Sequence, residues 1–92
     1  MNCEIKFENG HVETNTTRAL LYDIAVGYGK KTHEQALEIV ELGYYLWLKD
    51  NALTPIHVLG DYLSEMSQKK FKAFKGKSKY EQLDLFYSAK VY

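Results

Sequence analysis

The spacing of apolar residues changes from a strand period to a helix period early in this chain. Apolar and polar side chains first alternate, a pattern that is typical of a strand with one buried face. Asn9-Gly10 interrupts the alternation, and this pair favours the type I′ turn of a two-residue hairpin loop. The pattern predicts a β-hairpin of residues 2–8 and 11–16, in which Val12 and Thr14 continue the second strand.

After the predicted hairpin, apolar residues recur at helical spacing. They line one face of each of four segments, which are residues 17–27, 33–49, 55–75 and 79–91. Because a two-stranded hairpin is marginally stable by itself, Ile5 and Phe7 are expected to pack on these helices. The predicted fold class is α+β and mostly α, with an N-terminal β-hairpin packed on three to four helices. A chain of 92 residues fits one domain, residues 1–92.

Residues that cap helix N-termini precede the predicted helices. Thr32 and Gln35 are spaced as a capping box, and Ser78 and Glu81 repeat that spacing. Pro55 suits the first position of a helix, where its missing N–H costs nothing. The expected N-caps are Thr16 or Thr17, Thr32, Thr54 and Ser78.

The composition is that of a folded protein without a disulfide framework. Hydrophobic residues make up 46% of the chain, and Cys3 is the single cysteine. The longest nearly apolar run, residues 42–48, is too short to cross a bilayer. The N-terminus also lacks the pattern of a signal peptide. We therefore expect a cytoplasmic protein that does not act in a membrane.

Motifs for catalysis, metal binding or nucleotide binding are weak. The segment 27–32 resembles a phosphate-binding loop only partly, because Ile24 stands where the first glycine belongs and Lys31 precedes Thr32. The histidines, His11, His33 and His57, never occur at the short spacings of metal ligands. No Ser or Cys lies in a recognisable nucleophile motif. We therefore expect no enzyme activity, no catalytic residue, no metal site and no cofactor.

Charge is divided unevenly along a chain whose formal net charge is zero. Residues 1–65 contain mostly acidic charges, and residues 66–92 mostly lysines. Lysines in the last turn of the predicted helix 55–75 suit its dipole, but they continue past Gly76. Lysines neutralise phosphates, and exposed rings stack on unpaired bases. The segment 69–80 is therefore the predicted contact with nucleic acid or another polyanion, such as an acidic protein surface, through Lys69, Lys70, Lys72, Lys75, Lys77, Lys79 and Tyr80.

The interleaved rings of that segment have a second explanation. If Phe71 and Phe74 are buried, the segment is an amphipathic helix with solvated lysines, and its sequence needs no ligand.

The helix predicted over 33–49 is the alternative functional region. Its later turns are apolar almost all round, and such an excess often marks an interface. The alternative function is a regulatory or inhibitory protein-protein interaction module, of the small kind common in phage and mobile elements, possibly acting as a homodimer. Its expected interface residues are Glu34, Glu38, Glu41, Tyr44, Tyr45 and Trp47.

Overall fold

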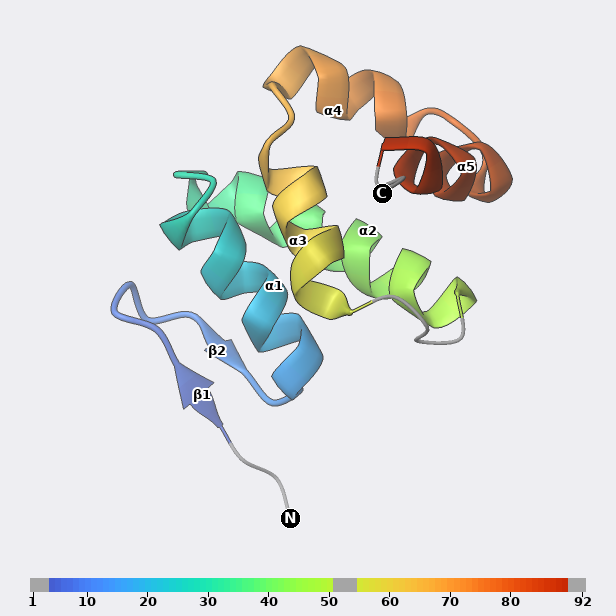
Figure 1. Ribbon diagram of the computed structural model, residues 1–92. Coiled ribbons are helices and arrows are strands. Elements are labelled where there is room, and N and C mark those ends of the chain that lie inside the picture. The colour runs from blue at the N-terminus through green and yellow to red at the C-terminus, as the bar shows by residue number, and fades with distance from the viewer. Residues whose placement is uncertain (1–3, 51–54, 90–92) are drawn as a thin grey trace.

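The computed structural model describes residues 4–50 and 55–89, and it contains a two-stranded hairpin followed by five helices. These elements are β1 (Ile5–Lys6), β2 (Val12–Glu13), α1 (Thr16–Gly27), α2 (His33–Lys49), α3 (Ile56–Ser64), α4 (Gln68–Lys75) and α5 (Lys79–Ala89). The predicted fold class, α+β and mostly α with an N-terminal hairpin, is confirmed (Figure 1). The expectations for Cys3, Thr54 and the end of the last helix fall outside the described residues.

The hairpin forms around the predicted turn, but its second strand ends at Glu13 instead of continuing through Thr14, and its loop contains one residue more than predicted. The Phe7 N–H donates to the His11 carbonyl, and the Gly10 N–H donates to the Phe7 carbonyl. Gly10 has a positive φ of 91°, which is typical of the last position in a three-residue loop. Asn9 is not among the described residues with positive φ, so the predicted type I′ turn was wrong.

The longer loop decides which face of β2 is buried. Ile5 pairs with Glu13, and Lys6 pairs with Val12. Directly opposed residues share a face of a sheet, and a shift of one residue therefore exchanges the two faces. As a result Glu13 points inward beside Ile5 and is 6% exposed, whereas Val12 faces solvent. The buried and the exposed face of the second strand are therefore the reverse of those expected from the sequence.

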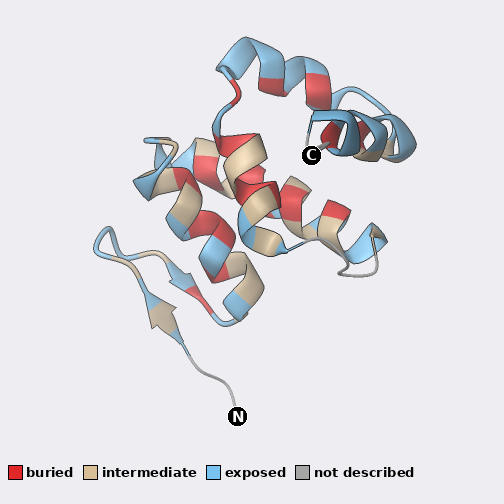
Figure 2. Ribbon diagram, in the orientation of Figure 1, coloured by how far each residue is buried: buried red, intermediate tan, exposed pale blue. Residues whose placement is uncertain are grey.

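Three helices, α1, α2 and α3, form the centre of the core, which buried phenylalanines of α4 and α5 extend (Figure 2). Two glycines allow them to approach closely. A side chain on Gly43 would meet the end of Leu21 at 3.1 Å, and one on Gly60 would meet Ile24 at 2.9 Å. Leu21 is fully buried at this crossing. The core therefore depends on small residues at the helix contacts as well as on apolar ones.

Side-chain caps begin most of the helices. The Thr32–Gln35 capping box of α2 is confirmed, since each side chain accepts a backbone N–H of the other residue. Ser78 accepts the Glu81 N–H in front of α5. The N-cap of α1 is Asn15, which accepts the Arg18 N–H, rather than Thr16 or Thr17.

The helix predicted over residues 55–75 is divided into α3 and α4. Pro55 lies just before α3 instead of at its first position. Ser67 caps α4 by accepting the Lys70 N–H, and the ammonium of Lys31 donates to the Met66 carbonyl at 2.8 Å. Met66 is itself buried, so the chain turns at a point that is anchored in the core.

The helices α4 and α5 pack beside α3 and α2 at the end of the molecule opposite the hairpin (Figure 1). Phe74 and Phe86 both make edge-to-face contacts with Tyr62 of α3. The Gln82 amide donates to the Phe74 carbonyl at 2.9 Å, and the Tyr87 hydroxyl donates to Asp50 at the end of α2. In the part of the chain that the structure describes, no helix is both long and apolar enough to span a bilayer.

Candidate functional site

The aromatic rings of α4 point inward, and most of its lysines point outward. Phe71 is 4% exposed and Phe74 is 3% exposed, whereas Lys69, Lys70 and Lys72 are exposed. These two phenylalanines therefore offer no free ring face on which a base could stack. This part of the predicted segment has the geometry of an amphipathic helix.

Two of the seven predicted site residues have partners within the molecule. The ammonium of Lys75 lies 3.5 Å from a carboxylate oxygen of Glu38. The ammonium of Lys79 lies 4.9 Å from the centre of the Tyr45 ring, a cation–π distance. The basic segment and the middle of α2, which the sequence suggested as rival sites, are therefore neighbours in the fold.

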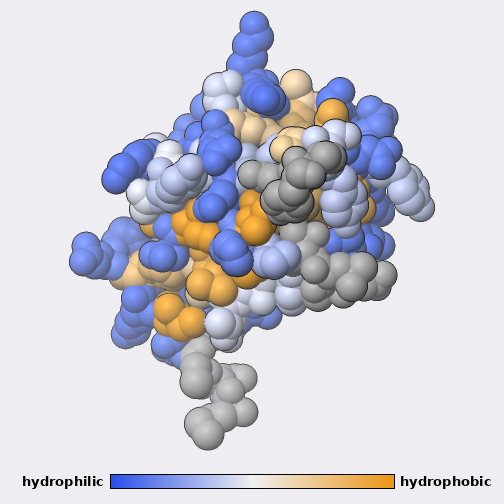
Figure 3. Space-filling model, in the orientation of Figure 1, coloured by the Kyte–Doolittle hydropathy of each residue, from blue (hydrophilic) through white to orange (hydrophobic). Residues whose placement is uncertain are grey.

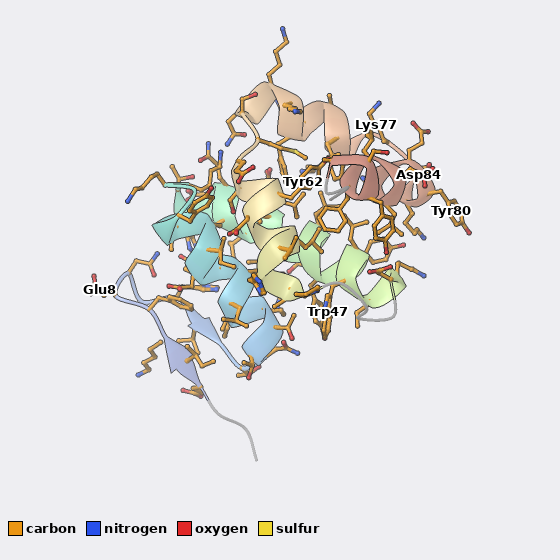
Figure 4. All side chains as sticks on the ribbon, in the orientation of Figure 1. Glu8, Trp47, Tyr62, Lys77, Tyr80 and Asp84 are labelled. Atoms are coloured by element: carbon orange, nitrogen blue, oxygen red, sulfur yellow. The ribbon has the colours of Figure 1, made fainter. Side chains whose placement is uncertain are left out.

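Four lysines remain on α4 and the turn after it, and we call them the lysine face: Lys69, Lys70, Lys72 and Lys77. All four are exposed, and none forms an ion pair or a cation–π contact with any described residue. No acidic residue lies within α4 to offset their charge. Lys77 lies at the far end of this face, beside α5 (Figure 4).

The start of α4 at Gln68 changes the explanation of the first two lysines. A continuous helix 55–75 would place them near its C-terminus, where the helix dipole favours cations. Instead Lys69 and Lys70 lie in the first turn of α4, where the dipole disfavours positive charge. Lys72 and Lys75 alone occupy the last turn. The intramolecular electrostatics of α4 therefore do not account for Lys69 and Lys70.

An apolar groove runs along one side of the lysine face. Its volume is about 430 Å³, and Lys70 and Lys77 are among its lining residues. Tyr62, Phe74 and Leu85 contribute apolar surface to the same lining. In Figure 4 the Tyr62 ring lies between α3 and the α4–α5 pair. A ligand on this side would meet two cations beside an apolar surface.

Tyr80 is the most exposed aromatic residue of the predicted segment. It is 81% exposed at the start of α5, and its side chain points away from the molecule (Figure 4). A ring in this position is free to stack or to contact a partner. The lysine face together with Tyr80 is the accessible part of the predicted binding segment.

The predicted interface on α2 is largely occupied by contacts inside the molecule. Arg18 donates to Glu41 at 2.6 Å, and this hydrogen bond is the main reason that the pKa of Arg18 is raised. Tyr44 stacks on Trp47, and both rings pack against the core. Three predicted interface residues therefore have partners inside the molecule, although the Glu41 side chain is itself 69% exposed.

The rest of that interface is accessible. Glu34 and Glu38 are exposed, Tyr45 is 39% exposed and Leu48 is 51% exposed. Leu48 belongs to the apolar excess that the sequence placed on this helix, and it adds exposed apolar surface beyond the six expected interface residues. On the face drawn in Figure 3, hydrophobic residues lie over α1, α3 and the hairpin, and the outer side of α4 is mainly hydrophilic.

A buried polar cluster under the hairpin was missed from the sequence. Glu13 accepts from Arg18 at 3.1 Å and lies 2.7 Å from His11. Tyr22, which is fully buried, bonds to Asn9 at 2.6 Å and to His33 at 2.8 Å. A reading of linear spacing could not find this cluster, because residues 9, 22 and 33 come together only in the folded chain.

The cluster does not assemble a conventional metal site. Among residues 4–50 and 55–89, no three His, Asp, Glu or Cys side chains converge in a way that could hold a metal ion.

Comparison with known proteins gives no further assignment. The chain matches no protein-family model, and neither a search of curated proteins nor one of solved structures finds a match. Its function must therefore be inferred from its own surface.

Proposed function

We propose that this chain is a non-enzymatic binding protein whose lysine face contacts nucleic acid or another polyanion. The observation that carries the proposal is the pair Lys69 and Lys70 in the first turn of α4. Cations there are disfavoured by the helix dipole, and no described residue neutralises them. An anionic partner would neutralise the two lysines and would itself be stabilised by the positive end of the helix dipole.

The same geometry indicates how such a partner would be held. Exposed lysines neutralise phosphates and release counterions, and this kind of binding carries no base specificity. Because Phe71 and Phe74 are buried, Tyr80 is the ring of the segment 69–80 that can stack on a base. We therefore expect binding that depends steeply on salt and weakly on sequence, with the phosphate backbone as the principal contact.

Fluorescence anisotropy on labelled single-stranded and duplex oligonucleotides tests the proposal. If all four lysines of the lysine face contact phosphates, the slope of log affinity against log salt is about −3 to −4. This slope corresponds to a loss of roughly a hundredfold between about 50 and 200 mM salt. Replacing Lys69, Lys70 and Lys72 by Gln should remove most of that dependence.

The chain offers a control with the same change of net charge. The variant Lys6→Gln, Lys30→Gln and Lys49→Gln also removes three exposed lysines, but from outside α4. It should retain nearly all of the affinity. Equal losses in both variants would show a general charge effect, and no binding at low salt would refute the nucleic-acid proposal.

Protein interaction through α2 is the second candidate function. The observation in its favour is the exposed apolar surface of Tyr45 and Leu48. Tyr45 also lines a hollow together with Glu38. A homodimer is the simplest association that would cover this apolar surface. Sedimentation velocity at two protein concentrations tests for self-association. Leu48→Ser should weaken a dimer, and it is a cleaner test than Trp47→Ala because Trp47 packs against the core.

A further inference from the structure

One buried hydroxyl group joins three separate parts of the chain. The Tyr22 hydroxyl on α1 bonds to Asn9 in the hairpin loop at 2.6 Å and to His33 at the start of α2 at 2.8 Å. We call these bonds the Asn9–Tyr22–His33 chain. The His11 ring also stacks on Tyr22, with ring centres 4.2 Å apart. The hairpin loop is therefore attached to both helices through Tyr22.

The direction of each bond follows from its donors and acceptors. The side-chain oxygen of Asn9 accepts the His11 backbone N–H, so its NH₂ group faces Tyr22 and can only donate. The Tyr22 oxygen accepts that bond, which leaves its own hydrogen available for Nδ1 of His33, 2.8 Å away. If the hydrogen is donated there, His33 accepts at Nδ1, which requires a neutral ring with its proton on Nε2.

A second proton on His33 is incompatible with this arrangement. Protonated Nδ1 becomes a donor, and the Tyr22 hydrogen loses its acceptor. Tyr22 has no exposed surface, whereas His33 is exposed, so water reaches the Tyr22 hydrogen only if the His33 ring swings away or the hairpin opens. An unsatisfied buried donor is strongly unfavourable, and opening of the hairpin relieves it.

The surrounding charges oppose one another. The His11 ring centre lies 5.1 Å from that of His33, so a charged His11 disfavours a charge on His33. Glu13 binds both His11 and Arg18, and Glu41 binds Arg18 in turn. On the other side of Tyr22 the charged residues of the adjoining hollow are Lys6, Glu8 and Asp23, and Glu34 follows His33 on α2. These carboxylates moderate the repulsion between the two rings but provide no acceptor for the Tyr22 hydrogen.

We propose that the Asn9–Tyr22–His33 chain is an acid-sensitive clasp, which holds the hairpin on α1 and α2 when His33 is neutral and releases it when His33 is protonated. Opening would uncover Tyr22 and the inner face of Phe7, whose rings are 4.5 Å apart in the closed form. The proposed clasp shares no residue with the lysine face and does not depend on the proposed function.

Hydrogen exchange on the full chain, followed by NMR between about pH 8 and pH 5, tests the clasp. The reporters are the amides of Phe7 and Gly10, which bond within the hairpin. Once intrinsic exchange rates are corrected for pH, their protection should fall as the pH is lowered, by up to roughly tenfold per pH unit. Amides in the buried middle of α2, at Val40 and Leu46, should keep theirs.

Two variants identify the responsible residue. His33→Gln places an uncharged acceptor near Tyr22, so the hairpin should stay protected at the acidic end of the titration. His57→Gln changes an exposed histidine of α3 and should leave the pH response intact. An unchanged pH response in folded His33→Gln would overturn the proposal, as would equal hairpin protection at both ends of the titration in the unmodified protein.

A third variant and a direct measurement keep the test decisive if His33→Gln does not fold. Tyr22→Phe removes the central hydroxyl, and hairpin protection at neutral pH should then drop to the acidic level of the unmodified protein. The ¹⁵N chemical shift of His33 reports its protonation state directly. A proton on Nδ1 in the closed form at neutral pH would refute the proposed bond direction.

Discussion

The hairpin end and the α4–α5 end of this molecule use charged residues in opposite ways. Beneath the hairpin, Glu13 is buried and Arg18 is partly buried, and they bond to each other and to their neighbours. On α4, Lys69, Lys70 and Lys72 face solvent without a described ion-pair partner. The fold explains the charges that have internal partners, and the lysines without them are those for which we propose an external ligand.

The largest expected effect tests whether the rings of α4 are structural. Phe74→Ala should lower the free energy of unfolding by about 3–5 kcal/mol, because it leaves a cavity against Tyr62. Chemical denaturation followed by Trp47 fluorescence measures the change. Lys72→Ala, on the exposed side of the same helix, is the control and should change stability by less than about 0.5 kcal/mol. A small effect of Phe74→Ala would mean that α4 is not anchored by its rings.

The second-largest expected change in stability concerns Glu13, whose carboxylate is buried beneath the hairpin. Glu13→Gln should cost about 1–3 kcal/mol, since an amide cannot satisfy both Arg18 and His11 while it is buried. Glu4→Gln, at an exposed position just before β1, is the control. Thermal unfolding at neutral pH distinguishes them. Equal stability of the two variants would remove the contrast between the two ends of the molecule.

The lysine face should contribute little to folding. Replacing Lys69, Lys70 and Lys72 by Gln should leave the free energy of unfolding within about 0.5 kcal/mol, or raise it slightly, because two cations leave the first turn of α4. Denaturation at low salt gives the clearest reading. A marked loss of stability would show that these lysines have a structural role.

The smallest effect appears at alkaline pH and concerns Tyr62. Burial raises the pKa of its phenol, so the folded state holds this proton more tightly than the unfolded chain. The resulting stability is complete below the ordinary tyrosine value of about 10, and it is lost as pH rises through the folded-state pKa. Tyr62→Phe should reduce this alkaline loss and remove a late step from the tyrosinate absorbance titration.

Tyr28 provides the comparison for that titration. A hydrogen bond to Glu65 raises its pKa, although its side chain is mainly exposed. Tyr28→Phe should therefore remove a different late step. If neither variant changes the titration, burial of Tyr62 has no effect on its ionisation.

Local sequence was sufficient for the elements whose formation depends on neighbouring residues. The capping box at Thr32 and Gln35 begins α2 as predicted, and Asn9-Gly10 marks the hairpin. The division of α3 from α4 was not predicted, because Ser67 lacks a reciprocal partner three residues later and Lys31 reaches Met66 from a distant loop. Such a long-range bond leaves no trace in local spacing.

In the candidate site, too, the local features could be predicted and the long-range contacts could not. The sequence located the lysine segment, but which of its members face solvent depended on tertiary contacts. Lys75 and Lys79 were engaged by Glu38 and Tyr45 of α2, and the phenylalanines were buried. Lys69, Lys70, Lys72 and Lys77 then remained available.

By itself the sequence determined that this chain is a helical domain with an N-terminal hairpin and a basic segment near its end, since periodicity, caps and charge runs are local properties. Only the tertiary structure decided the register that buries Glu13, the meeting of Asn9 with Tyr22 and His33, and the position of Lys69 and Lys70 at the start of a helix. Each of these outcomes depends on residues that are distant in the sequence. Packing and hydrogen bonding bring them together only when the whole chain has folded.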